Sequence, residues 1–277
     1  MSILPRHLDW RRRHNTVRAA WGSDTSGVKT YSFNSLGFRG EDYRPCAVRR
    51  VFVCGCSHTF GTGLNEEEAW PSVFKRRYAI ALGIPEKDVN LLNFADAGAS
   101  NDYICRTTIV QIAASRPDAL AVLFTYKNRS EHWEGEQTRA LGPWVLDATA
   151  DCNPWVGDRE RYRELAAAYY DLYSDELGTV QTLKNILLVQ EFCRVRKIPF
   201  VLASLESRGL YTDTRHESGP QPLLGLLERS RFAELNIHDR DMQIDRAADG
   251  LHLGPQSHAL IGKRLFEVFG RNHGLPT

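Results

Sequence analysis

The chain has 277 residues, of which 42% are hydrophobic and 25% charged, and its 35 Lys and Arg residues nearly balance 34 Asp and Glu residues. This is the mixture of a globular protein, and it excludes a disordered, collagen-like or coiled-coil chain. The net charge of +1 gives no reason to expect a nucleic acid or an acidic membrane surface as a partner. No apolar run reaches the ~20 residues that a membrane helix needs.

Residues 1–49 are polar and rich in turn residues, and we interpret them as a lead-in that packs on the main domain. The first twenty residues are basic but lack the apolar core of ~7–15 residues that a secretion signal contains. Six cysteines are scattered along the chain. Without an export signal, reduced thiols and a cytoplasmic location are expected.

From residue 50 onward, short continuous apolar segments alternate with amphipathic ones. Such apolar runs are typical of parallel strands buried on both faces. We predict strands at residues 51–54, 89–94, 119–124 and 199–203. We predict helices at residues 67–82, 102–114, 159–197 (two segments meeting near Gly178), 223–232 and 256–269.

This alternation predicts a single α/β domain over residues 50–277. Its architecture should be a three-layer α/β/α sandwich with a central parallel sheet and right-handed crossovers. Residues 126–157 contain three tryptophans but show no clear period, and we interpret them as an insertion.

Polar loops follow three of the predicted strands, at residues 55–63, 97–101 and 125–129. In an open parallel sheet, ligands bind beyond these carboxyl ends. The first loop lacks the glycine spacing of a dinucleotide site, the lysine of a phosphate loop and the second glycine of the α/β-hydrolase elbow. What remains is Ser57, directly after a buried strand. By itself this serine is equally well explained as a helix cap.

A second polar pair lies near the C-terminus. Asp249 and His252 are three residues apart, which on a helical turn places both side chains on the same side. A serine hydroxyl becomes a good nucleophile when a base takes its proton, and that base needs an orienting acid. The pair therefore favours a catalytic interpretation of Ser57.

Together these four segments resemble blocks I, II, III and V of the SGNH (GDSL-type) hydrolase superfamily. Residues 34–40 also resemble the sequence that precedes block I in many bacterial members. The matching segments span residues 50–262, which is most of the chain. The matching residues are Gly55-Cys56-Ser57 with Thr59, Gly61 and Gly63 for block I, Gly98 for block II, Asn128 for block III, and Asp249 with His252 for block V.

The resemblance implies a flavodoxin-like SGNH hydrolase fold and a serine acyl-ester hydrolase, an esterase or deacylase acting on an O-acylated small molecule or sugar. Ser57 would be the nucleophile, His252 the general base and Asp249 the acid that orients it. The backbone N–H groups of Ser57 and Gly98 and the side-chain amide of Asn128 would form the oxyanion hole. No cofactor and no metal are implied.

Three positions depart from the family pattern. Cys56 replaces the block I aspartate, and Leu253 stands where a proline commonly follows the block V histidine. Asn128 lies in Tyr-Lys-Asn-Arg rather than the usual Gly-x-Asn-Asp.

Other interpretations of the same residues stay open. An O-acyltransferase would use the same serine, histidine and aspartate with an alcohol acceptor, and a binding module would keep the fold without the chemistry. A metal cluster of Cys54, Cys56 and His58 is disfavoured because no other motif supplies ligands at zinc spacing. His258 is the nearest competitor of His252 as the base.

Several side chains are candidates for contact with the substrate. Tryptophan faces in the insertion could stack on a sugar or an acyl chain, although Trp is also normal in a core. The substrate-binding candidates are His58, Tyr126, Trp133, Trp144, Trp155 and His258.

Overall fold

The computed structural model describes residues 6, 15, 17–19, 30–134, 137–147, 159–212 and 220–277. Trp155 therefore lies outside the described residues, as does most of the basic N-terminal segment.

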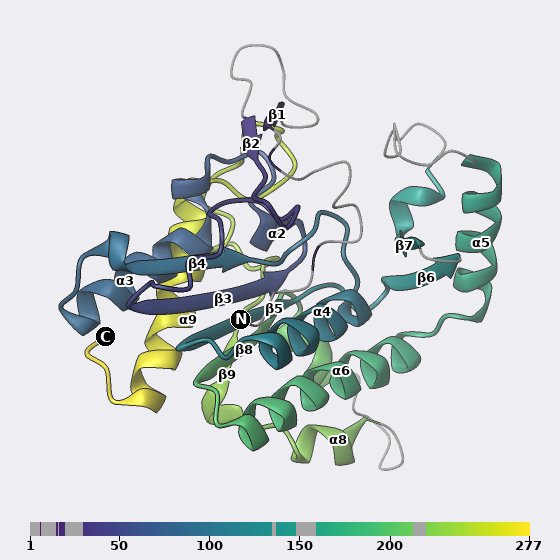
Figure 1. The fold of residues 1–277 in the computed structure, drawn as a ribbon. Helices are drawn as coiled ribbons and strands as arrows, with labels where there is room; N and C mark the ends of the chain where they lie inside the picture. Colours follow the sequence, from purple (N-terminus) through teal and green to yellow (C-terminus); the bar gives the residue numbers. More distant parts are fainter. Residues whose placement is uncertain are drawn as a thin grey trace.

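Five parallel strands form the central sheet, in the order β4-β3-β5-β8-β9 (Figure 1). Renumbered by their order in the chain, this is the 2-1-3-4-5 order of flavodoxin-like sheets, in which the chain reverses its direction of progress between β3 and β5. The strands are β3 (Arg49–Gly55), β4 (Val89–Asn93), β5 (Ala119–Phe124), β8 (Phe200–Ser204) and β9 (Phe232–Glu234).

Helices cover both faces of this sheet. The helices α3 (Trp70–Leu82) and α9 (Pro255–His273) pack together on one face. The helices α4 (Asn101–Ala114) and α6 (Asp175–Arg196) pack together on the other (Figure 1). The predicted three-layer α/β/α sandwich is therefore confirmed.

The sequence of α9 shows why this segment forms a helix and why it packs where it does. Proline occupies the first position of α9, where its missing N–H costs nothing, and Gly274 ends the helix in a left-handed conformation. Ile261, Leu265 and Phe269 recur every fourth residue and are buried. This stripe drives α9 onto the sheet and α3.

The break between the two helices predicted at residues 159–197 falls elsewhere than expected. The helix α5 (Arg159–Leu172) ends before α6 begins, and Ser174 caps α6 by accepting the N–H of Leu177 at 3.2 Å. Gly178 lies inside α6, where a Cβ would come within 2.9 Å of the Lys127 carbonyl oxygen. That glycine marks a close packing contact rather than a helix end.

The helix predicted at residues 223–232 is wrong in its second half. The short helix α8 (Gln221–Gly225) and the 3₁₀ turn η4 (Arg229–Arg231) lead into β9, the edge strand that pairs Phe232 with Leu202. Three residues are too few to show a strand period, so pairing with β8 rather than local pattern decides this strand.

The insertion contains an antiparallel hairpin, β6 (Ser130–Glu134) and β7 (Gln137–Leu141), followed by the 3₁₀ turn η3 (Pro143–Val145). It packs with α5 around a small core of its own, formed by Leu141, Val145, Tyr162 and Ala166. We call the hairpin, η3 and α5 the lobe. It stands beside the main body in Figure 1.

The lead-in carries β2 (Thr30–Ser32), which pairs with β1 (Val17–Ala19). Its Tyr31 and Phe33 pack with Phe60, and Phe38 enters the main core. The remaining elements are α2 (Ser57–Phe60), η1 (Glu66–Glu68), η2 (Glu86–Asp88) and α7 (Ser207–Thr212).

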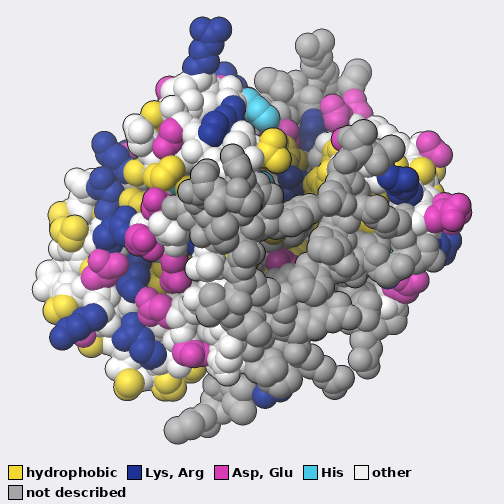
Figure 2. Space-filling view, turned by 90° about the horizontal axis from the view of Figure 1, so that it is seen from above, with side chains coloured by type: hydrophobic (Ala, Val, Ile, Leu, Met, Phe, Trp, Pro, Cys, Tyr) yellow, Lys and Arg dark blue, Asp and Glu magenta, His cyan; other side chains and the backbone are white. Residues whose placement is uncertain are grey.

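Acidic and basic side chains are mixed over the face shown in Figure 2, in keeping with the near-zero net charge. Among the described helices, none combines the length and the apolar character required to cross a membrane.

Candidate active site

Ser57 begins α2, a single helical turn directly after β3, and is 6% exposed. The turn between strand and helix is tight, because a Cβ at Gly55 would lie 2.0 Å from the Thr59 hydroxyl oxygen. The Ser57 carbonyl accepts the N–H groups of Gly61 at 2.8 Å and Thr62 at 3.0 Å. The serine is thus presented at the carboxyl end of a central strand, as predicted from its position after an apolar run.

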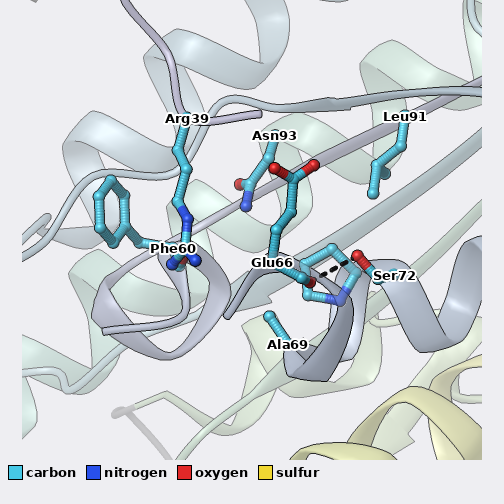
Figure 3. Close-up of a pocket in the computed structure, with 8 residues that line it drawn as sticks. Arg39, Phe60, Glu66, Ala69, Ser72, Leu91 and Asn93 are labelled. Carbon is cyan, nitrogen blue, oxygen red and sulfur yellow. Dashed lines mark hydrogen bonds between the residues drawn. The ribbon is translucent and has the colours of Figure 1, made fainter. Parts of the chain in front are cut away.

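A buried arginine from the lead-in holds this loop. Arg39 donates hydrogen bonds to the carbonyl oxygens of Phe60 at 2.8 Å, Gly61 at 2.6 Å and Leu64 at 2.7 Å. Its guanidinium lies beside Phe60, and the two residues help to line a cavity of about 10 Å³ (Figure 3). Burial lowers the pKa of Arg39 from its usual value, and burial raises the pKa of the neighbouring Glu66.

Two more polar side chains fasten the same loop. Asn93, at the end of β4, donates to the Thr59 carbonyl at 2.8 Å, and the Tyr31 hydroxyl accepts the N–H of Gly63 at 2.7 Å. The sequence patterns assign no role to Arg39, Asn93 or Tyr31. Only Arg39 could have been singled out from the sequence, because it belongs to the segment 34–40 that resembles the sequence preceding block I in the family.

The expected acid–base pair is formed. His252 Nδ1 lies 2.6 Å from Asp249 Oδ2, and Asp249 Oδ1 accepts the N–H groups of Leu251 and His252, each at 3.0 Å. Burial alone would raise the pKa of Asp249, but the hydrogen bonds from His252 and the backbone outweigh it and lower the pKa. The ionised carboxylate therefore fixes the orientation of the imidazole.

The loop of Ser57 and the loop of Asp249 lie against each other. Ala248 donates its N–H to the Gly63 carbonyl at 3.2 Å, and a Cβ at Gly63 would lie 3.2 Å from Asp249 Cγ. The ring of His58, the residue after Ser57, meets the ring of His252 edge-on at 5.3 Å between centroids. Within the described residues the Ser57 hydroxyl makes no hydrogen bond, so its contact with His252 stays a prediction.

Two further histidines lie behind this pair. His58 is 6% exposed, and its ring is 6.2 Å from that of His258. Its Nδ1 has no hydrogen-bond partner in the described ranges of the chain. His258 is fully buried and accepts the N–H of Trp70 at 3.1 Å. Burial lowers the pKa of His58 well below its usual value and lowers that of His258 to about 3. His258 therefore offers no surface to a substrate in this structure.

The loops at residues 97–101 and 125–129, which are expected to complete the oxyanion hole, are joined by hydrogen bonds. Asn101, at the start of α4, accepts the N–H of Thr125 at 2.7 Å and donates to the Thr125 carbonyl at 3.2 Å. Gly98 has a left-handed φ of +82°, which a residue with a side chain rarely adopts. Asn128 is anchored by its carbonyl, which accepts the Tyr170 hydroxyl at 2.8 Å, while its side-chain amide is free of partners among the described residues.

The substrate-binding candidates separate into two groups. Tyr126 and Trp144 both contact Arg129, with ring centroids 4.8 Å and 4.7 Å from its guanidinium carbon. A Cβ at Gly98 would lie 3.5 Å from the Trp144 ring. Trp133, on the hairpin, is 48% exposed and lies against Arg106 instead. Trp144 rather than Trp133 thus borders the expected oxyanion hole.

The cysteines near the site are buried. Burial raises the pKa of Cys54 to about 12, and its thiol faces the Phe94 and Ile104 carbonyls. Across the described part of the chain, no group of three His, Cys, Asp or Glu side chains is placed to hold a metal ion.

No protein-family model matches the chain, and no curated protein matches it in sequence. Solved structures with a similar backbone include TesA, at 11% identity and a TM-score of 0.48, where the match covers 80% of this chain and 99% of TesA. The esterase EstA from Pseudoalteromonas sp. has 11% identity and a TM-score of 0.47, and the match covers 82% of this chain and 99% of EstA. A lipase/acylhydrolase from Enterococcus faecalis is also similar, with 16% identity and a TM-score of 0.40, and the match covers 83% of this chain and 98% of that protein. The assignment of chemistry rests on the residues of this chain.

Proposed function

We propose that this chain is a serine ester hydrolase of the SGNH type. The observation that carries the proposal is the Asp249–His252 hydrogen bond of 2.6 Å, formed on a loop that packs against the loop of Ser57. A histidine held by an ionised carboxylate beside a serine at a strand end is the arrangement that activates a hydroxyl for acyl transfer.

In this mechanism the Ser57 oxygen attacks the carbonyl carbon of the ester, and the hydroxyl proton passes to His252. The tetrahedral intermediate collapses, the C–O bond to the alcohol breaks, and His252 returns the proton to the departing alcohol. Water then attacks the acyl carbon while His252 accepts a proton from it. The bond from that carbon to Ser57 Oγ breaks, and His252 returns the proton to the serine oxygen, which releases the acid and restores Ser57. Asp249 stabilises the imidazolium in both halves.

The negative charge that develops on the carbonyl oxygen needs fixed donors. The N–H groups of Ser57 and Gly98 and the amide of Asn128 are the proposed donors, and the free amide of Asn128 supports this assignment. Each such donor typically contributes roughly 3–4 kcal/mol to transition-state stabilisation.

The second candidate function is O-acyl transfer to an alcohol. Trp144 favours it, because an aromatic wall beside Gly98 would exclude water from the acyl-serine. Incubation with an acyl donor, with and without an acceptor alcohol, followed by mass analysis of the products, separates hydrolysis from transfer.

Labelling by a fluorophosphonate probe tests the proposal. We expect the intact protein to become labelled at Ser57, with peptide mapping to separate Ser57 from its neighbour Cys56. Ser57→Ala should abolish the label, whereas Ser230→Ala, at an exposed serine far along the chain, should not. An unlabelled wild-type protein would overturn the proposal in favour of a non-catalytic binding module.

A further inference from the structure

Arg129 follows β5, and its guanidinium contacts two aromatic rings. Its guanidinium carbon lies 4.8 Å from the centroid of the Tyr126 ring and 4.7 Å from that of Trp144. A guanidinium stacked in this way loses little further freedom when it binds an anion, since its orientation is already set.

Within the part of the chain that the structure describes, the charge of Arg129 has no counter-ion. Among the described residues its one hydrogen bond is to the Ala99 carbonyl at 3.5 Å, no carboxylate lies within 4.0 Å, and its buried Nε has no partner. The neighbouring arginines differ. Arg106 pairs with Glu131 at 2.5 Å, and Arg139 pairs with Glu134 at 3.2 Å. Half-buried polar groups that stay unpaired call for a functional explanation.

The position of Arg129 ties it to the proposed catalytic serine. Its hydrogen-bond partner Ala99 follows Gly98, and Trp144 borders both Arg129 and Gly98. After burial and the rings of His252 and His258, the charge of Arg129 is a further cause that lowers the pKa of His58, the residue next to Ser57. The cation therefore lies within electrostatic reach of the reacting centre.

We propose that Arg129 binds an anionic group on the substrate, such as a carboxylate, so that the substrates are esters carrying a negative charge close to the scissile bond. The inference rests on the proposed hydrolase function and deepens it by naming the substrate class. A guanidinium can take a carboxylate with two parallel N–H···O bonds, which gives direction as well as attraction.

Two fluorophosphonate probes of equal length test the proposal, one ending in a carboxylate and the other in its methyl ester. In each reaction a bond forms between Ser57 Oγ and phosphorus, the P–F bond breaks, fluoride leaves and the hydroxyl proton passes to His252. Labelling rates are followed by mass spectrometry. We expect the wild type to react about tenfold faster with the carboxylate probe, because charge-assisted hydrogen bonds are the stronger ones.

Arg129→Gln should lose this preference, and Arg129→Lys should keep part of it. Arg194→Gln, at an exposed arginine paired with Glu191, is the matched control and should retain the wild-type ratio. Because the ratio is taken within each variant, a general loss of reactivity cancels. Equal rates in the wild type, or an unchanged preference in Arg129→Gln, would overturn the proposal while leaving the hydrolase function standing. If neither probe labels Ser57, both fall.

Discussion

Arg39 is a buried cation whose three hydrogen bonds all end on backbone carbonyls of one loop, the loop that begins with Ser57. Its ring contacts, 4.3 Å to Tyr31 and 5.3 Å to Phe60, add to the attraction of the nearby glutamates, of which Glu66 acts most strongly, in offsetting the cost of burying the charge. Arg39 therefore acts as a positioning residue, since it reaches the serine only through the backbone.

Replacement of Arg39 tests that role. We expect Arg39→Met to lower the free energy of unfolding by about 3 kcal/mol or more, because three buried carbonyls lose their donor. It should also slow phosphonylation of Ser57 by about 10²-fold, the cost of a loop displaced by roughly 1 Å. Denaturant unfolding and labelling kinetics measure the two effects.

Arg116→Met is the control for this substitution. Arg116 is exposed and donates to a single carbonyl, that of Lys197 at 2.5 Å. Its loss should change the unfolding free energy by no more than about 0.5 kcal/mol. Equal effects of the two substitutions would mean that Arg39 contributes as an ordinary surface arginine.

At the scale of elements, the contact between α3 and α9 depends on one small residue. A Cβ at Gly262 of α9 would lie 2.7 Å from Val73 Cβ and 2.9 Å from the Trp70 carbonyl oxygen of α3. Because backbone atoms cannot move aside as a flexible side chain can, the two helices approach each other closely only with glycine here.

Gly262→Ala should therefore separate the helices and lower the free energy of unfolding by about 1–3 kcal/mol, as overpacking in a core does. Gly225→Ala is the matched change at the end of α8, where nothing lies within 4 Å of the added Cβ. There the substitution should be neutral or stabilising by up to about 1 kcal/mol, since it restricts the unfolded chain. Thermal or denaturant unfolding of both variants checks the contrast, and equal stabilities would contradict it.

At the scale of the whole molecule, two buried histidines make stability depend on pH. Burial lowers the pKa of His258 to about 3 and lowers that of His58 as well, whereas an unfolded histidine titrates near 6.5. Below about pH 6.5 the unfolded chain binds protons that the folded chain does not. The folded state therefore loses stability as the pH falls, and above that pH these two groups make no difference.

His258→Gln should show this linkage. Each such histidine contributes a slope of up to about 1.4 kcal/mol per pH unit below the unfolded pKa. The free energy of unfolding of the variant should thus fall less steeply between pH 6 and 4 than that of the wild type. Parallel curves from denaturant titrations across this range would show that His258 is not held neutral in the folded protein.

The local patterns were sufficient for the parts of the fold that repeat along the chain. The strand at residues 119–124 has the predicted bounds, and the alternation of strands and helices yielded the three layers. The patterns failed where three-dimensional pairing decides, as at Phe232 in the edge strand β9, and where a glycine serves packing rather than a helix end, as at Gly178.

The sequence by itself determined the apolar periodicity, and with it the layers and the carboxyl edge of the sheet at which Ser57 lies. It also paired Asp249 with His252, because residues three apart on a turn share a side whatever surrounds them. Only the tertiary structure decided that Arg39 braces the serine loop, that His258 is sealed in the core, and that Trp144 lies against both Arg129 and Gly98. Those contacts join segments far apart in the chain, and the spacing of residues along a sequence carries no information about them.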